Sequence, residues 1–217
     1  MFCYQCQETA KNEGCTVQGV CGKKEDTANA QDLLIFVTKG LAEVANKLNE
    51  DNTEVYDRIS NNLFVTITNA NFDTPAIMDV VKETINMKDS LIEKLDSKED
   101  LSDIALYSSL DDGELEKKAI EVGVLNTINE DERSLVELTT YGLKGMAAYN
   151  HHANVLGYRD VEVDRFIAHA LEETTKSDKE INNLIDLVLD TGSHGVKAMA
   201  LLLSLIHISE PTRPRLI

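Results

Sequence analysis

Residues 27–49, TANAQDLLIFVTKGLAEVANKLN, carry the clearest structural signal in the chain. Their apolar side chains recur at the three- and four-residue spacing of one helix face, at Leu33, Leu34, Val37, Leu41, Val44, Ala45 and Leu48. Asp26 or Thr27 is a suitable N-cap, because either side-chain oxygen can accept a hydrogen bond from a backbone amide of the first turn. The pattern predicts a long amphipathic α-helix that buries one face.

The remainder of the chain continues in the same way. Helices are predicted over residues 52–69, 74–95, 114–122, 129–157, 161–175, 178–189 and 192–202, with a short one at 101–107. The β-branched run at residues 63–67 makes a strand the competing interpretation there. Asp73 or Thr74 is expected to cap the helix that has Pro75 in its first turn. We therefore predict an all-α fold of helical bundles joined by short loops.

Composition limits the classes of function. The chain has 217 residues, 42% of them hydrophobic, which is enough to bury a core. Its net charge of −17 argues against nucleic acid as a partner, because phosphates would be repelled. The sequence has no segment of 18 consecutive apolar residues, so it predicts no membrane-spanning helix. No secretory signal is visible either, and we therefore expect a cytoplasmic protein.

All four cysteines lie near the N-terminus, at Cys3, Cys6, Cys15 and Cys21, with the spacing C-x2-C-x8-C-x5-C. A disulfide framework would spread its bridges over the fold, and a reducing compartment disfavours it. The clustering therefore predicts a metal site. The C-x2-C step lets two thiolates converge from a tight turn, and the longer steps let the chain supply two more.

The spacing favours an iron–sulfur cluster over zinc. Structural zinc with four thiolates usually uses two C-x2-C pairs, and only one is present. A cubane has an iron at each of four corners, so its ligands need not come in close pairs. Asn12, Gly14, Gly19 and Gly22 would let backbone amides approach the sulfides. Structural zinc and unrelated free thiols remain the alternatives.

Lysines near the predicted ligands have two interpretations. Lys11, Lys23 and Lys24 could offset cluster charge or dock an acidic electron donor, or they could be ordinary surface lysines.

Other candidates favour structural roles. His151 and His152 are adjacent on a predicted helix, so their side chains point about 100° apart and cannot chelate one metal well. We interpret them as a partly exposed pair. Gly142 and Gly145 resemble a small-residue face for close helix packing.

The last residues, 203–217, change in character. The segment LSLIHISEPTR at residues 203–213 resembles the in-frame translation of a sequencing adapter. We expect a non-native tail, with a disordered native C-terminus as the alternative. The predicted layout is therefore a cluster-binding loop at 1–26, an α-helical bundle domain at 27–202 with a sub-boundary near 97–112, and the tail at 203–217.

Several motifs resemble one known family, the hybrid-cluster or prismane proteins, which are hydroxylamine reductases. The likeness spans residues 1–202 and is carried by MFCYQCQETAK at 1–11, GCT at 14–16, VCGK at 20–23, TAN at 27–29, QDLL at 31–34, TNANFD at 68–73, YGLKGMAAY at 141–149 and GVKAMALL at 195–202.

The resemblance implies two three-helix bundles and a [4Fe-4S] cluster held by Cys3, Cys6, Cys15 and Cys21. A branch of the family with wider cysteine spacing holds a two-iron cluster instead. The family's second centre is a hybrid iron–sulfur–oxygen cluster, with His, Glu and Cys ligands in later domains. Its reaction is the two-electron reduction of hydroxylamine to ammonia and water, and reduction of nitric oxide is also attributed to it.

The chain would then be the electron-entry domain of a reductase. A redox donor would supply electrons, and the full-length parent would act on hydroxylamine or a small nitrogen oxide. We expect the chain alone to be inactive, because the hybrid-cluster ligands are absent from it, and we assign no catalytic residue. The alternative is a stand-alone single-cluster electron-transfer protein, or a helical domain with a structural metal.

Overall fold

The computed structural model describes residues 3–6, 14–67, 70–176 and 180–209. Within these ranges every regular element is helical, which confirms the all-α prediction. The helices, in chain order, are α1 (Glu25–Leu48), α2 (Thr53–Val65), α3 (Thr74–Ile92), α4 (Asp103–Leu106), α5 (Asp112–Glu121), the 3₁₀ turn η2 (Val124–Asn126), α6 (Glu130–Val155), α7 (Val161–Glu173) and α8 (Ile181–Ser209).

Helix starts follow the predicted capping chemistry in α3 but not in α1. The Asp73 carboxylate accepts a hydrogen bond from the Ala76 amide at 3.1 Å, as expected for an N-cap. Helix α1 instead begins at Glu25, with Lys24 as an N-cap that makes no side-chain hydrogen bond. The prediction of Asp26 or Thr27 as its cap was therefore wrong. Acidic residues in the first turn favour this earlier start, because they complement the positive end of the helix dipole.

Two boundaries differ from the sequence prediction. Helix α2 was predicted over 52–69 and ends at Val65, and the competing strand at 63–67 does not form. Helix α8 is continuous where two helices were predicted, and it runs through Gly192. Close packing on α6 explains this, because a Cβ at Gly142 would lie 2.7 Å from Thr191 Cγ2. Glycine inside a helix costs about 1 kcal/mol, and packing of α8 on α6 opposes that cost.

Helix α8 also extends past residue 202 to Ser209. The expected non-native tail thus begins inside a helix, and its origin stays a prediction.

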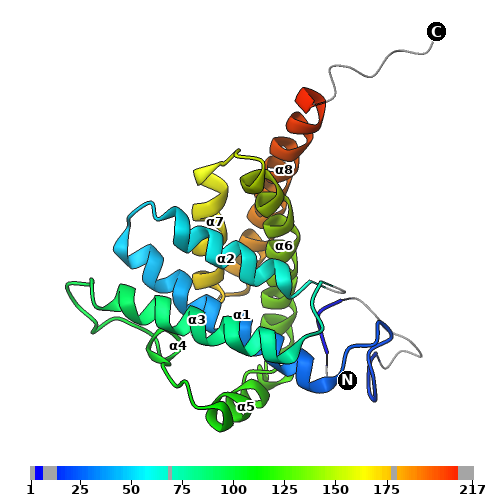
Figure 1. Cartoon of the computed structure of the whole chain (residues 1–217), viewed down its shortest axis with the longest axis vertical. Coiled ribbons are helices and arrows are strands. Elements are labelled where there is room, and N and C mark those ends of the chain that lie inside the picture. The colour runs from blue at the N-terminus through cyan, green and yellow to red at the C-terminus, as the bar shows by residue number, and fades with distance from the viewer. Residues whose placement is uncertain (1–2, 7–13, 68–69, 177–179, 210–217) are drawn as a thin grey trace.

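Two hydrophobic clusters share the central helix α1. The larger one joins the second half of α1 to α2, the end of α3, α4, α6, α7 and α8. The smaller one joins the first half of α1 to α3 and α5. Figure 1 shows α3 lying along α1, with α6 and α8 side by side. Because α1 serves both clusters, the two helical groups are not consecutive pieces of the chain.

The N-terminal segment lies at the end of the helical body where α1 begins (Figure 1). Among the described residues, no helix is long and apolar enough to cross a membrane.

Candidate metal centre

The four cysteines lie on loop segments that precede α1. Cys3 and Cys15 are buried, Cys6 is half-buried and Cys21 is exposed, and all four are free thiols. Burial raises the pKa of the Cys3 thiol, whereas the Gln5 backbone amide and the positive charge of Lys23 lower it.

Glycine backbone shapes the turn around Cys21. The Gly22 amide donates to Gly19 O and the Gly19 amide donates to Lys23 O, both at 2.8 Å. A Cβ at Gly19 would lie 3.2 Å from the Cys21 sulfur, and Gly22 has a φ of +94° that other residues rarely adopt. Gly14 also has positive φ. Asn12, the fourth turn residue singled out in the sequence, lies outside the described residues.

The described thiols are only partly brought together. Cys3 and Cys6 are close enough for the charge of one to influence the pKa of the other. Among the described residues, no group of three or more Cys, His, Asp or Glu side chains is arranged to hold a metal ion. The donor set nevertheless suits a cluster by its chemistry, because four free thiols are gathered within one short segment and two of them are shielded from water.

A buried polar network lies beside the Cys3–Cys6 segment. The Gln5 Nε2 donates to Asp32 Oδ1 at 2.5 Å, and the Lys144 ammonium donates to Gln5 Oε1. Lys23 Nζ donates to Gln31 Oε1 at 2.5 Å. Exposure is 4% for Gln5, 1% for Lys23, 5% for Lys144 and 7% for Asp32. Lys23 is therefore not an ordinary surface lysine, although its neighbour Lys24 is exposed; Lys11 lies outside the described residues.

Burial shifts the proton affinity of the charged pair in this network. It raises the pKa of Asp32 to about 7, an effect opposed by the positive charge of Lys144. It lowers the pKa of Lys144 to about 8, opposed by the negative charge of Asp32. The sequence reasoning missed these two residues, although Asp32 and Lys144 both stand in motifs that carry the family resemblance. Their separation in the chain hid their proximity.

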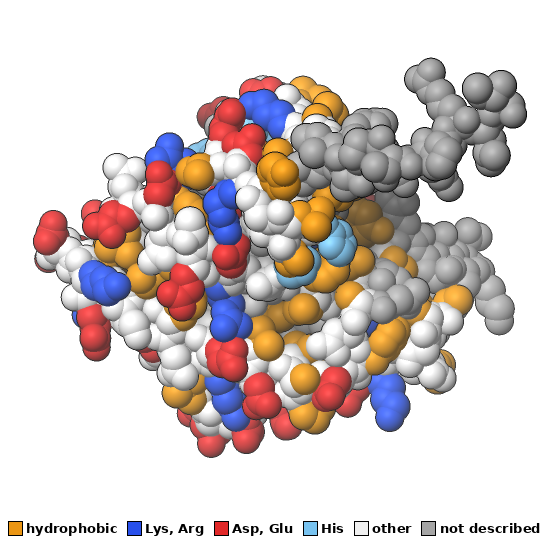
Figure 2. Space-filling model, turned by 45° about the horizontal axis from the view of Figure 1, so that its top comes forward, with side chains coloured by type: hydrophobic (Ala, Val, Ile, Leu, Met, Phe, Trp, Pro, Cys, Tyr) orange, Lys and Arg blue, Asp and Glu red, His pale blue; other side chains and the backbone are white. Residues whose placement is uncertain are grey.

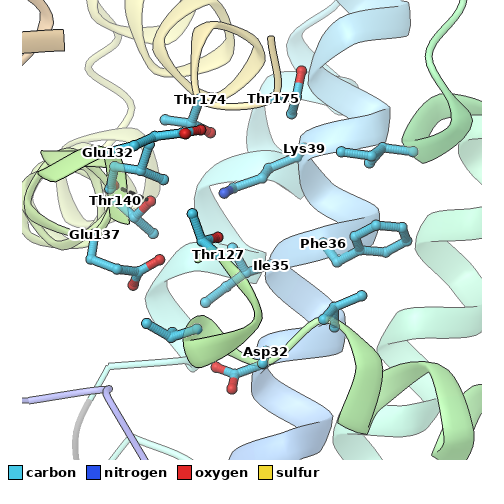
Figure 3. Close-up of a pocket in the computed structure, with 15 residues that line it drawn as sticks. Asp32, Ile35, Phe36, Lys39, Thr127, Glu132, Glu137, Thr140, Thr174 and Thr175 are labelled. Atoms are coloured by element: carbon cyan, nitrogen blue, oxygen red, sulfur yellow. Dashed lines mark hydrogen bonds between the residues drawn. The ribbon is translucent and has the colours of Figure 1, made fainter. Parts of the chain in front are cut away.

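A pocket of about 200 Å³ opens beside Asp32, between α1 and α6. Figure 3 shows the Lys39 amino group reaching into it, with Glu132 and Glu137 on the opposite side. Three carboxylates and one lysine line this pocket, so its charge is unsuited to an anionic ligand. The carboxylates of this pocket also affect the polar network, since the negative charge of Glu137 raises the pKa of Asp32.

The histidine pair is part of an aromatic contact. The His151 ring stacks on Phe64 with centroids 4.8 Å apart, and His152 meets the edge of the same ring at 5.5 Å. His151 is half-buried and His152 exposed, as the sequence predicted for a partly exposed pair. Figure 2 shows hydrophobic side chains gathered around histidines on one face of the molecule. The arrangement is packing rather than metal ligation.

Comparison with known proteins places the chain in a family. The model of the Prismane/CO dehydrogenase family matches residues 1–209. A hydroxylamine reductase of Desulfovibrio desulfuricans is 48% identical over 206 residues, covering 93% of this chain and 38% of the relative. One from Bacteroides thetaiotaomicron is 49% identical, covering 92% of this chain and 37% of the relative. One from Clostridium perfringens is also 49% identical, covering 93% and 38%.

The chain therefore spans less than two fifths of the length of these relatives. The similarity nonetheless runs across almost all of this chain, including the cysteine segment and the helical body. The resemblance seen in the motifs is confirmed: the chain belongs to the Prismane/CO dehydrogenase family.

Proposed function

We propose that this chain is the iron–sulfur-binding N-terminal part of a hydroxylamine reductase and serves as its electron-entry domain. The observation that carries the proposal is the set of four free thiols, two of them buried, at the start of a chain whose relatives are named hydroxylamine reductase. Cys3, Cys6, Cys15 and Cys21 would hold a [4Fe-4S] cluster. When bound, such a cluster accepts and gives up single electrons.

The chain's own residues support that role in two ways. Burial of Cys3 and Cys15 keeps water from two of the ligands, and shielding of this kind is one of the factors that set a cluster's potential. Lys23 and Lys144 place positive charge beside a site that would carry the negative charge of four thiolates. An exposed Cys21 leaves one side of the site near the surface, where a redox donor could approach.

The reaction itself belongs to the parent protein. Hydroxylamine takes up two electrons and two protons; the N–O bond breaks, and ammonia and water leave. We propose that a hybrid cluster outside this chain carries this chemistry, and that the chain alone turns over no hydroxylamine.

Anaerobic reconstitution with iron and sulfide tests the cluster assignment. We expect about four irons per chain, and visible absorption that dithionite bleaches reversibly. About one zinc per chain in place of iron would instead support a structural zinc site. About two irons would indicate the two-iron branch.

Sequencing the source DNA across codon 202 tests whether this chain is part of a longer reductase. A continuing frame with further Cys, His and Glu codons supports the reductase. A native stop codon there would contradict the reductase proposal and support a stand-alone electron-transfer protein instead.

A further inference from the structure

Gln5 links the Cys3–Cys6 segment to two helices at once. Its amide oxygen accepts from Lys144 on α6, and its amide nitrogen donates to Asp32 on α1 at 2.5 Å. Both bonds are buried. Since buried hydrogen bonds to charged groups contribute more to stability than neutral ones, this link holds the backbone between the two cysteines in place.

A second link holds the other end of the cysteine segment to the same helix. Lys23 Nζ donates to Gln31 Oε1 at 2.5 Å, and Gln31 Nε2 in turn donates to Asn71 O at 3.1 Å. Gln31 and Asp32 are adjacent on α1. The chain before Cys6 and the chain after Cys21 are therefore tied to neighbouring positions of one helix.

The two links bring two cations into a site that also holds carboxylates. The ammonium groups of Lys23 and Lys144 are buried with the Asp32 carboxylate, and the half-buried Glu137 carboxylate adds a second negative charge close to Lys144 and Asp32. A buried cation is costly unless negative charge compensates it. Lys144 bonds to Gln5, the residue before Cys6, and Lys23 stands two residues after Cys21, so both cations lie beside the chain that carries the thiols.

We propose that Gln5, Lys144 and Lys23 form a clasp that fixes both ends of the cysteine segment on α1 and α6 and supplies positive charge to the thiolate ligands. The proposal rests on the proposed cluster. Gln5 and Lys144 act through the cysteines, so they are positioning residues.

The test compares three variants of the full chain after anaerobic reconstitution. Gln5→Ala removes the link but keeps all charges, and Lys144→Met removes one charge and one donor. Lys88→Met is the matched control, because Lys88 is an equally buried lysine on α3 that bonds to Asp89 and to the Ala105 carbonyl. The measurements are the rate of iron loss to a chelator, the midpoint potential and the helical circular dichroism.

We expect iron loss to accelerate about tenfold in Gln5→Ala and Lys144→Met, as found when groups that orient metal ligands are removed. The potential should fall in Lys144→Met, because the lost cation stabilised the reduced, more negative cluster. Lys88→Met should change neither. Gln5→Ala retains every charged group, so it tests the clasp even if Lys144→Met does not fold.

Two outcomes would overturn the clasp. If wild type binds iron and both clasp variants match Lys88→Met in iron loss and potential, the clasp is wrong and the cluster assignment stands. If wild type binds no iron, the cluster assignment fails and the clasp fails with it.

Discussion

Two regions of the molecule bury lysines, and they balance the charge differently. Lys88, in the helical body, donates to the Asp89 carboxylate and to the Ala105 carbonyl, each at 2.6 Å. Its counter-charge is its own sequence neighbour. Beside the cysteines, Lys23 and Lys144 donate to the neutral amides of Gln31 and Gln5. Lys88 is balanced within the helical body, whereas Lys23 and Lys144 lie beside the cysteine segment with the Asp32 and Glu137 carboxylates close by.

The largest effect should come from the cysteines beside this network. Cys15→Ser or Cys6→Ser should lose most of the bound iron after reconstitution, because a serine oxygen is a poor substitute for a soft thiolate. Iron and sulfide analysis measures this, with Lys88→Met as the control that keeps all four thiols. Full iron content in both serine variants would refute the cluster assignment.

The helical-body lysine should affect stability instead. Lys88→Ala leaves a cavity and a carbonyl without its donor, so we expect the free energy of unfolding to fall by about 2–5 kcal/mol. Lys88→Met keeps most of the volume and should cost about 1–3 kcal/mol. Urea unfolding followed by circular dichroism gives both values. Equal losses in the two variants would show that volume is unimportant at this position.

The charged pair beside the cysteines should make stability depend on pH in the metal-free chain. Burial raises the pKa of Asp32 from 3.8 to about 7, so its carboxylate destabilises the folded state increasingly as pH rises through this range. Burial lowers the pKa of Lys144 from 10.5 to about 8, so stability recovers between pH 8 and 10.5.

Asp32→Asn separates the first effect from the second. Subtracting its unfolding free energy from that of wild type should leave a difference that falls from pH 4 to 7. The matched comparison is Asp89→Asn, whose partner Lys88 lies in the helical body. A difference between wild type and Asp32→Asn that is independent of pH would contradict the assigned shift.

Surface ion pairs should have the smallest effect. Arg165 pairs with Asp51 at 2.7 Å, and both side chains are substantially exposed. Solvent screens such pairs, so Arg165→Ala should leave the midpoint of urea unfolding almost unchanged. A shift in the urea midpoint as large as that of Lys88→Met would contradict the expectation that exposed charges contribute less to stability than buried ones.

Local chemistry made much of the helical layout predictable. Asp73 caps α3, and Asn129, where the long sixth helix was expected to begin, accepts from the Asp131 and Glu132 amides. These signals act within one turn, so they can be read from neighbouring residues. The break expected near residues 189–192 was wrong: α8 continues through Gly192, where the neighbouring Thr191 packs closely on Gly142 of α6.

The sequence alone identified an all-helical protein, the four cysteines and the family. Helix periodicity, thiol spacing and motif identity depend only on the order of residues in the chain. It could not show that Lys23 is buried, or that Gln5 meets Lys144 across 139 positions. Those facts depend on how α1 and α6 pack beneath the cysteine segment. The free-energy cost of a charged group depends on its burial and on its contacts with distant residues, and both exist only in the folded chain.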